Sequence, residues 1–227
     1  MNVIVFASRK GGTGKSTLAA HLAAYCQKSS RSCLLVDADQ QGSLTLWHSL
    51  RKSGEPSLKS GLTDFDETLE QARRDGIEWV LVDTPPLATI EVSQTLAAAT
   101  LVVIPTRPAV FDLNAVTETI AAARLANTPF ALVLNAVPPK RLGTESPMAL
   151  NARRSFDALE APVWSGQITN RASLALSLAD GATVDEFSFD SRAAAEEISA
   201  LWTAIENSVA AINGVYAGTV MHQKAAA

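Results

Sequence analysis

The chain has 227 residues, of which 47% are hydrophobic and 19% charged, so it is long and apolar enough to bury the core of a full α/β domain. The formal net charge of −4 argues against wholesale electrostatic attraction to nucleic acid, and two cysteines are too few for a disulfide scaffold or a four-ligand metal site. The composition also excludes a globally disordered chain and a coiled coil.

Short apolar runs alternate with longer helical patterns along the chain. The runs predict strands over 3–7, 33–36, 79–82, 101–104 and 130–134, with a weaker candidate at 163–164. Helices are expected over 15–27, 43–51, 64–74, 90–98, 112–125, 146–159 and 190–213, and the clearest loop over 53–61. Because the runs are continuously apolar, as in strands covered on both faces, the alternation predicts an α/β fold with a doubly wound, mainly parallel sheet flanked by helices.

The two ends of the chain show no targeting signal. The apolar run at 3–7 is too short for a signal peptide, and no stretch reaches the roughly 18–20 apolar residues of a membrane span. Residues 214–227 carry one basic side chain, Lys224, which is a poor basis for a membrane-surface helix. We expect one domain over 1–213, a flexible tail over 214–227, and a cytoplasmic protein that does not associate with membranes.

A glycine-rich segment lies between the first strand and the first helix. Its glycines allow backbone amides to turn toward phosphate oxygens, and the helix N-terminus adds its dipole. In such a loop Lys15 supplies charge to the β- and γ-phosphates, and the Ser16 hydroxyl is the expected Mg²⁺ ligand. The segment therefore predicts a P-loop that binds ATP with Mg²⁺, through Lys10, Gly11, Gly12, Thr13, Gly14, Lys15, Ser16 and Thr17.

This loop departs from the ordinary P-loop pattern. Arg9 stands five residues before Gly14, where the pattern has glycine, and a second lysine, Lys10, precedes the double glycine. The form resembles the deviant Walker A loop of the ParA/MinD family of ATPases. The resemblance implies that Lys10 reaches across an ATP-sandwich dimer and, with Lys15, takes part in catalysis. Taken without the rest of the motif, Lys10 also reads as a solvated loop charge.

Three aspartates follow predicted strands: Asp37 and Asp39 the second, and Asp83 the third. Carboxylates at the carboxyl ends of adjacent parallel strands face one crevice, where they orient water or anchor Mg²⁺; turn- and cap-forming aspartates are the alternative reading. The segments resemble the two switch motifs of the family. The resemblance implies that Asp39 is catalytic through the attacking water, with Asp37 beside it and Asp83 in the metal site together with Ser16. Gln40 stands where the family usually has proline.

Later segments extend the resemblance to short plasmid-type ParA partition proteins over about 1–213. They are 43–47, 103–108 with Asp112, 168–171 and 178–181. Asn135 ends the fifth predicted strand, at a position where the family often recognises adenine; an asparagine there also suits a turn.

Clustered cations are the requirement for non-specific DNA binding. Lys140, Arg141, Arg153 and Arg154 fall in one window whose only acid is Glu145, and Arg171 is a further candidate. Ordinary solvated surface charge is the competing interpretation. In the family the DNA surface forms across the ATP dimer, which would double a modest patch.

The leading hypothesis is a ParA-like ATPase that forms an ATP-dependent homodimer, binds DNA non-specifically and associates with the nucleoid. A ParB-like or cargo-adaptor protein would stimulate hydrolysis, so that a plasmid, a chromosome region or a protein assembly is partitioned or positioned. One alternative is a MinD-like regulator that cycles on membranes. Another is an ATP-dependent metabolic synthase, which would need a further substrate pocket.

Overall fold

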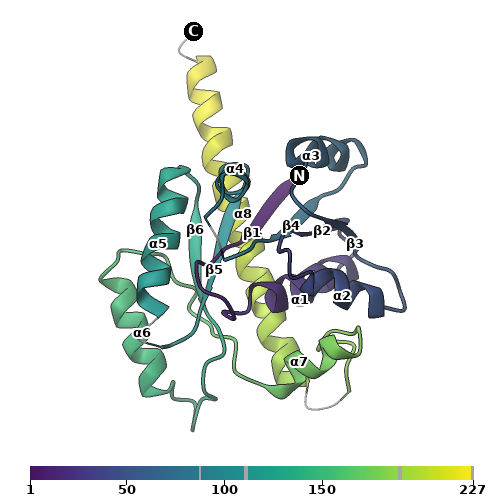
Figure 1. Ribbon diagram of the computed structural model, residues 1–227. Coiled ribbons are helices and arrows are strands. Elements are labelled where there is room, and N and C mark those ends of the chain that lie inside the picture. The colour runs from purple at the N-terminus through teal and green to yellow at the C-terminus, as the bar shows by residue number, and fades with distance from the viewer. Residues whose placement is uncertain (87, 110–111, 189–190, 226–227) are drawn as a thin grey trace.

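The computed structural model describes residues 1–86, 88–109, 112–188 and 191–225. One six-stranded parallel sheet runs through the molecule in the order β3-β2-β4-β1-β5-β6 (Figure 1). The strands are β1 (Asn2–Phe6), β2 (Cys33–Asp37), β3 (Ser57–Ser60), β4 (Trp79–Asp83), β5 (Leu101–Thr106) and β6 (Phe130–Leu134). The prediction of an α/β fold with a doubly wound parallel sheet is confirmed.

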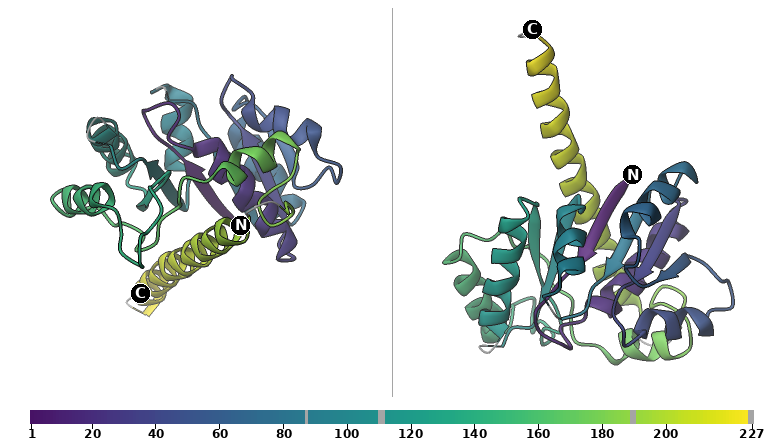
Figure 2. Two further views of the ribbon diagram at one scale, coloured as in Figure 1. Left: turned by 90° about the horizontal axis from the view of Figure 1, so that it is seen from below. Right: turned by 45° about the horizontal axis from the view of Figure 1, so that its top comes forward.

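Helices cover both faces of the sheet (Figures 1 and 2). Successive strand residues point to opposite faces, so Ile4 and Phe6 join one core while Val3 and Val5 join the other. The first core is closed by α1 (Lys15–Lys28), α2 (Ser43–Leu50), α7 (Ala172–Ala179) and α8 (Arg192–Ala225). The second is closed by α3 (Phe65–Arg74), α4 (Ile90–Ala97), α5 (Asp112–Leu125) and α6 (Pro147–Asp157).

The structure corrects four predictions about individual elements. The expected loop over 53–61 contains the edge strand β3, and α7 lies in a segment for which no helix was predicted. The weak strand at 163–164 is reduced to a single bridge between Leu132 and Val163. The last helix, expected to end at 213, continues to Ala225. None of the described helices is both long enough and apolar enough to cross a membrane.

The order of the strands determines where a ligand can bind. From β1 the chain crosses past β4 to β2, toward one edge of the sheet. From β4 it crosses past β1 to β5, toward the other edge. The connections leave β1 and its neighbours in opposite directions, and the crevice at such a reversal lies at the carboxyl ends of the strands. The glycine-rich loop follows β1 at this edge.

Helix α1, which follows that loop, is held in place by a buried histidine. His21 is fully buried; its Nε2 atom lies 3.1 Å from the Leu174 carbonyl oxygen, and its Nδ1 atom accepts from the Val184 backbone N–H at 3.4 Å. Both contacts suit a neutral ring that donates from Nε2. Burial lowers the pKa of His21 to about 4. The histidine thus fastens α1 to α7 in its uncharged form.

We expect stability to fall as the pH drops from 6.5 to 4. In this window unfolded His21 takes up a proton that the folded protein excludes, so His21 contributes a loss of about 3 kcal/mol. Urea unfolding at several pH values tests this against His21→Gln, which keeps a donor for the Leu174 carbonyl. The comparison isolates His21 because the carboxylates titrate in both proteins. Equal pH dependence in the two proteins would contradict the assignment.

Candidate nucleotide-binding site

The glycine-rich loop is held by contacts from two distant elements. Gly12 and Gly14 have φ angles of 70° and 98°, a region that side chains disfavour. The Arg9 backbone N–H donates to Thr119 Oγ1 of α5 at 3.1 Å, and Asn135 Nδ2 donates to the Thr13 carbonyl at 2.7 Å. These contacts fix the shape of the loop, as a preorganised phosphate site requires.

Asn135 lies directly against this loop. A Cβ atom at Gly14 would lie 2.0 Å from Asn135 Nδ2, so only glycine allows this approach. The side chain is buried after β6, at the carboxyl edge as predicted, and its amide nitrogen bonds the loop backbone. Contact with adenine stays a prediction.

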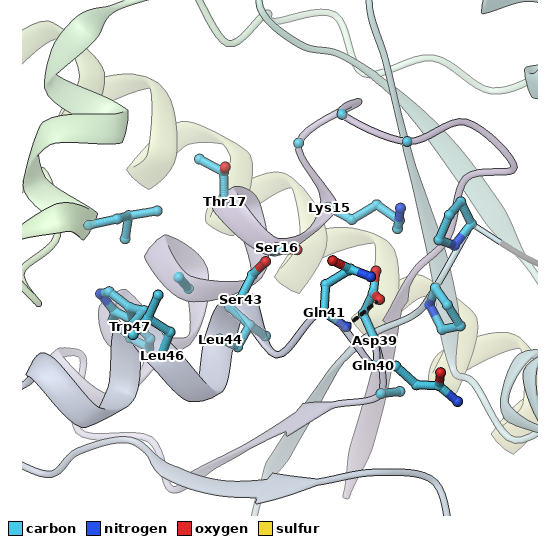
Figure 3. Close-up of a pocket in the computed structure, with 18 of the residues that line it drawn as sticks. Lys15, Ser16, Thr17, Asp39, Gln40, Gln41, Ser43, Leu44, Leu46 and Trp47 are labelled. Atoms are coloured by element: carbon cyan, nitrogen blue, oxygen red, sulfur yellow. Dashed lines mark hydrogen bonds between the residues drawn. The ribbon is translucent and has the colours of Figure 1, made fainter.

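Lys15 begins α1 and is almost completely buried. Burial lowers the pKa of its ammonium group, and the negative charges of Asp83 and Asp39 partly oppose this effect. Figure 3 shows Lys15, Ser16 and Asp39 on the walls of one cleft. A buried cation between carboxylates at a helix N-terminus is suited to bind an anion that carries its own metal ion.

Asp37 and Asp83 are register partners on β2 and β4, so their side chains leave the sheet at the same level. Both are buried, and neither oxygen of Asp83 has a hydrogen-bond partner in the described structure, nor does Oδ1 of Asp37. Burial raises the pKa of Asp83 to about 7, although the nearby Ser16 hydroxyl and Lys15 favour its charged form. Buried carboxylate oxygens without partners call for a ligand.

These donors fit Mg²⁺ that is bound largely through water and phosphate. Within the described ranges no group of three or more His, Cys, Asp or Glu side chains forms a cage for a metal ion. Mg²⁺ typically keeps several waters and uses one or two carboxylates plus substrate phosphates. Ser16, Asp37 and Asp83 provide that kind of partial set.

The second oxygen of Asp37 is already engaged. Asp37 Oδ2 accepts from both the backbone N–H and the hydroxyl of Thr45, each at 2.7 Å, and Thr45 Oγ1 also lies 2.9 Å from Ser60 Oγ on β3. Through Thr45, Asp37 therefore holds the start of α2 at the carboxyl edge of the sheet, beside the candidate metal site. The sequence analysis did not identify Thr45 in this role.

Asp39 lies in the turn between β2 and α2. Its Oδ1 atom accepts from the Gln41 backbone N–H at 3.0 Å, and its side chain is partly exposed to the cleft (Figure 3). The neighbouring Gln40, at the position where proline was expected, is exposed. The carboxylate can accept a hydrogen bond from a water molecule in the cleft.

The cleft has a volume of about 1850 Å³, well above the roughly 300–1,000 Å³ of ordinary small-ligand pockets. The phosphate loop lines one part of it. Another part is apolar, between α2 and α7, where Leu46 and Leu50 are exposed. The cleft therefore extends well beyond the phosphate loop.

The candidate DNA-binding cations differ in how far the fold uses them. Lys140, Arg141 and Arg154 are exposed. Arg153 instead forms an ion pair with Glu145 at 2.9 Å and donates to the carbonyls of residues 164–166. Arg171 pairs with Glu197 at 3.3 Å. The last two guanidinium groups therefore hold their own chain together.

Lys10 is partly buried in the first turn of the loop. Its backbone N–H donates to Ser8 Oγ at 3.4 Å, and its carbonyl accepts from Thr13 Oγ1 at 3.5 Å. A role for Lys10 across a dimer stays a prediction.

Comparison with known proteins gives a consistent result. Residues 4–184 match the CobQ/CobB/MinD/ParA nucleotide binding domain. The maintenance of carboxysome distribution protein A of Gloeobacter kilaueensis is 34% identical over 209 residues, covering 88% of this chain and 95% of that protein. Its namesake in Halothiobacillus neapolitanus is 31% identical over 205 residues, covering 86% and 92%. A Cyanothece McdA–ATP complex has a TM-score of 0.70 at 17% identity, covering 91% and 96%. The domain match includes the loop and all three carboxylates.

Proposed function

Because the chain belongs to the CobQ/CobB/MinD/ParA nucleotide-binding family and is a ParA/MinD-type ATPase, we propose that it works as an ATP-dependent positioning switch. ATP with Mg²⁺ brings two copies together, and the dimer binds DNA non-specifically. A ParB-like or cargo-adaptor protein then stimulates hydrolysis and releases the dimer. The cargo is a plasmid, a chromosome region or a protein assembly, and the names of the two relatives favour the last.

The observation that carries this proposal is the in-register pair Asp37 and Asp83 beside a preformed phosphate loop. Loop amides and Lys15 bind the phosphates, while Ser16, Asp37 and Asp83 would hold the metal ion. Bound Mg²⁺ would neutralise charge on the β- and γ-phosphates. Asp39 orients a water molecule for in-line attack on the terminal phosphate.

The dimer and DNA steps rest on two supporting features. The cleft is larger than an ordinary small-ligand pocket and extends beyond the phosphate loop, which suits a site that a second copy of the chain closes. Lys140, Arg141 and Arg154 are exposed cations near one another in sequence, and a dimer would present two such groups. We propose these three as the DNA-facing residues. Arg153 and Arg171 are not included, because their guanidinium groups already form ion pairs with Glu145 and Glu197.

Binding to random-sequence duplex DNA with ATP, ADP or no nucleotide tests the switch. We expect binding only with ATP, and we expect higher salt to weaken it because phosphate contacts release counterions. Lys140→Ala combined with Arg141→Ala should reduce it. ATP-driven dimerisation without DNA binding in any state would reject the DNA step and direct attention to a membrane or protein surface.

Asp39→Ala is expected to retain ATP binding, to reduce hydrolysis by about 100-fold or more and to accumulate the dimer, because a group that positions the attacking water contributes on this scale. Phosphate release and light scattering measure the two effects. Asp157→Ala, which removes an exposed carboxylate at the end of α6, is the matched control. A monomeric Asp39→Ala variant in ATP would contradict the assigned role.

A further inference from the structure

Arg107 directly follows β5 at the same edge as the phosphate loop, which follows β1. Two prolines, Pro105 and Pro108, restrict the backbone on either side of it. The Thr106 carbonyl accepts from the Asn135 backbone N–H at 2.8 Å, and Thr106 is buried. The backbone that carries Arg107 is therefore held in place, and its side chain lines the cleft.

The guanidinium group of Arg107 lies against the phosphate loop. A Cβ atom at Gly12 would be 3.4 Å from Arg107 Nη2 and 3.9 Å from its Cζ. The contact falls on the part of the loop that precedes Gly14, away from the start of α1. Lys10 belongs to the same part of the loop, whereas Lys15 is the first residue of α1.

In the part of the chain that the structure describes, no carboxylate pairs with the Arg107 guanidinium group. Some arginines elsewhere pair with glutamates, as Arg51 does with Glu186 at 2.9 Å and Arg153 with Glu145 at 2.9 Å. Arg107 is exposed, and its guanidinium group forms no hydrogen bond or ion pair with the residues that the structure describes. Its planar donors match two phosphate oxygens at once, so a cation placed beside inward-turned amides is suited to bind an anion.

We infer that Arg107 is a phosphate-binding residue that contacts the terminal phosphate of ATP from the β5 side of the loop. The inference rests on the proposed ATP site. The helix N-terminus at Gly14 to Thr17 faces the inner phosphates. Arg107 lies beside Gly12, which precedes this helix N-terminus in the loop. The terminal phosphate would lie there. The contact would distinguish ATP from ADP, which lacks that group.

Calorimetric titration with Mg²⁺ and either ADP or a non-hydrolysable ATP analogue tests this. In Arg107→Ala we expect the affinity for the analogue to fall about tenfold or more, as for the loss of a charge-assisted hydrogen bond, while the affinity for ADP changes less than about threefold. Arg107→Lys should fall between the two proteins, because it keeps the charge and loses the two-pronged geometry. Arg192→Ala, which removes an arginine that is 93% exposed on α8, is the matched control.

The outcomes separate this inference from the proposed function. If the wild-type protein binds both nucleotides and Arg107→Ala loses neither or loses both equally, Arg107 does not bind the terminal phosphate. The second of those results would assign it to holding the loop. A wild-type protein that binds neither nucleotide overturns the ATP site and this inference together.

Discussion

Lys15→Ala is expected to weaken ATP binding by at least about 100-fold and, with it, to abolish every ATP-dependent property of the protein. Lys15 is the buried cation at the centre of the site, between the loop amides and the carboxylates of Asp83 and Asp39. Without it, those carboxylates face the phosphates with no compensating charge. A loss of this size corresponds to about 3 kcal/mol, within the range for losing one partner of a buried charged interaction.

Titration calorimetry with ATP and Mg²⁺ measures this effect, and thermal unfolding confirms that the variant is folded. Lys28→Ala is a matched control on the same helix, because Lys28 lies at the other end of α1 in an exposed ion pair with Asp185. It should bind ATP as the wild type does. Binding by Lys15→Ala within about threefold of the wild type would remove Lys15 from the site.

Gly181→Ala is expected to destabilise the protein by about 3 kcal/mol or more. A Cβ atom at Gly181 would lie 2.3 Å from the Leu50 carbonyl oxygen and 2.8 Å from the Arg51 nitrogen, and φ is 68°. These neighbours are backbone atoms at the end of α2, so they cannot move aside as a flexible side chain would. Overpacking adds to the strain of a positive φ.

The contact also matters because Arg51 fixes α2 here. Its Nη1 donates to the Gly181 carbonyl, its side chain pairs with Glu186, and it lies 4.7 Å from the Trp47 ring centre. Gly76→Ala is the control, since Gly76 has a φ of 72° with open space around it and should cost about 1 kcal/mol. Urea unfolding compares the two variants. Equal losses would mean that the contact with α2 contributes nothing.

The sequence was sufficient where a residue's role follows from its place on a strand. Continuous apolar runs predicted five of the six strands, and carboxyl-end placement predicted that Asp37, Asp83 and Asn135 reach one edge. It was insufficient for β3, because an edge strand of Ser57, Leu58, Lys59 and Ser60 is mostly exposed and lacks an apolar run. Helix α7 was missed because it is short and its inward face includes Ser173 and Ser177.

Side-chain partners across the fold were also beyond prediction. Nothing in the pattern around Arg107 shows that its guanidinium group lies beside Gly12, which is 95 residues earlier in the chain. Arg153 lies in a basic window of the sequence, which made it a candidate for DNA binding. In the structure it bonds Glu145 and three carbonyl groups that the chain brings together only on folding. Sequence patterns predict which edge or face a residue occupies, whereas its hydrogen-bond partners depend on tertiary packing.

Helix α8 makes the molecule long in one direction, with the phosphate loop toward one end and the last turns of α8 at the other (Figure 2). At about 1.5 Å per residue, its 34 residues span about 50 Å. Asn213 Nδ2 donates to Asn2 Oδ1 at the amino end of β1, so the helix beyond this point extends away from the edge that carries the phosphate loop (Figure 2). If two copies meet at that edge, the Ala225 end of each α8 would lie far from the contact between them, so a label fused there would stay clear of the nucleotide.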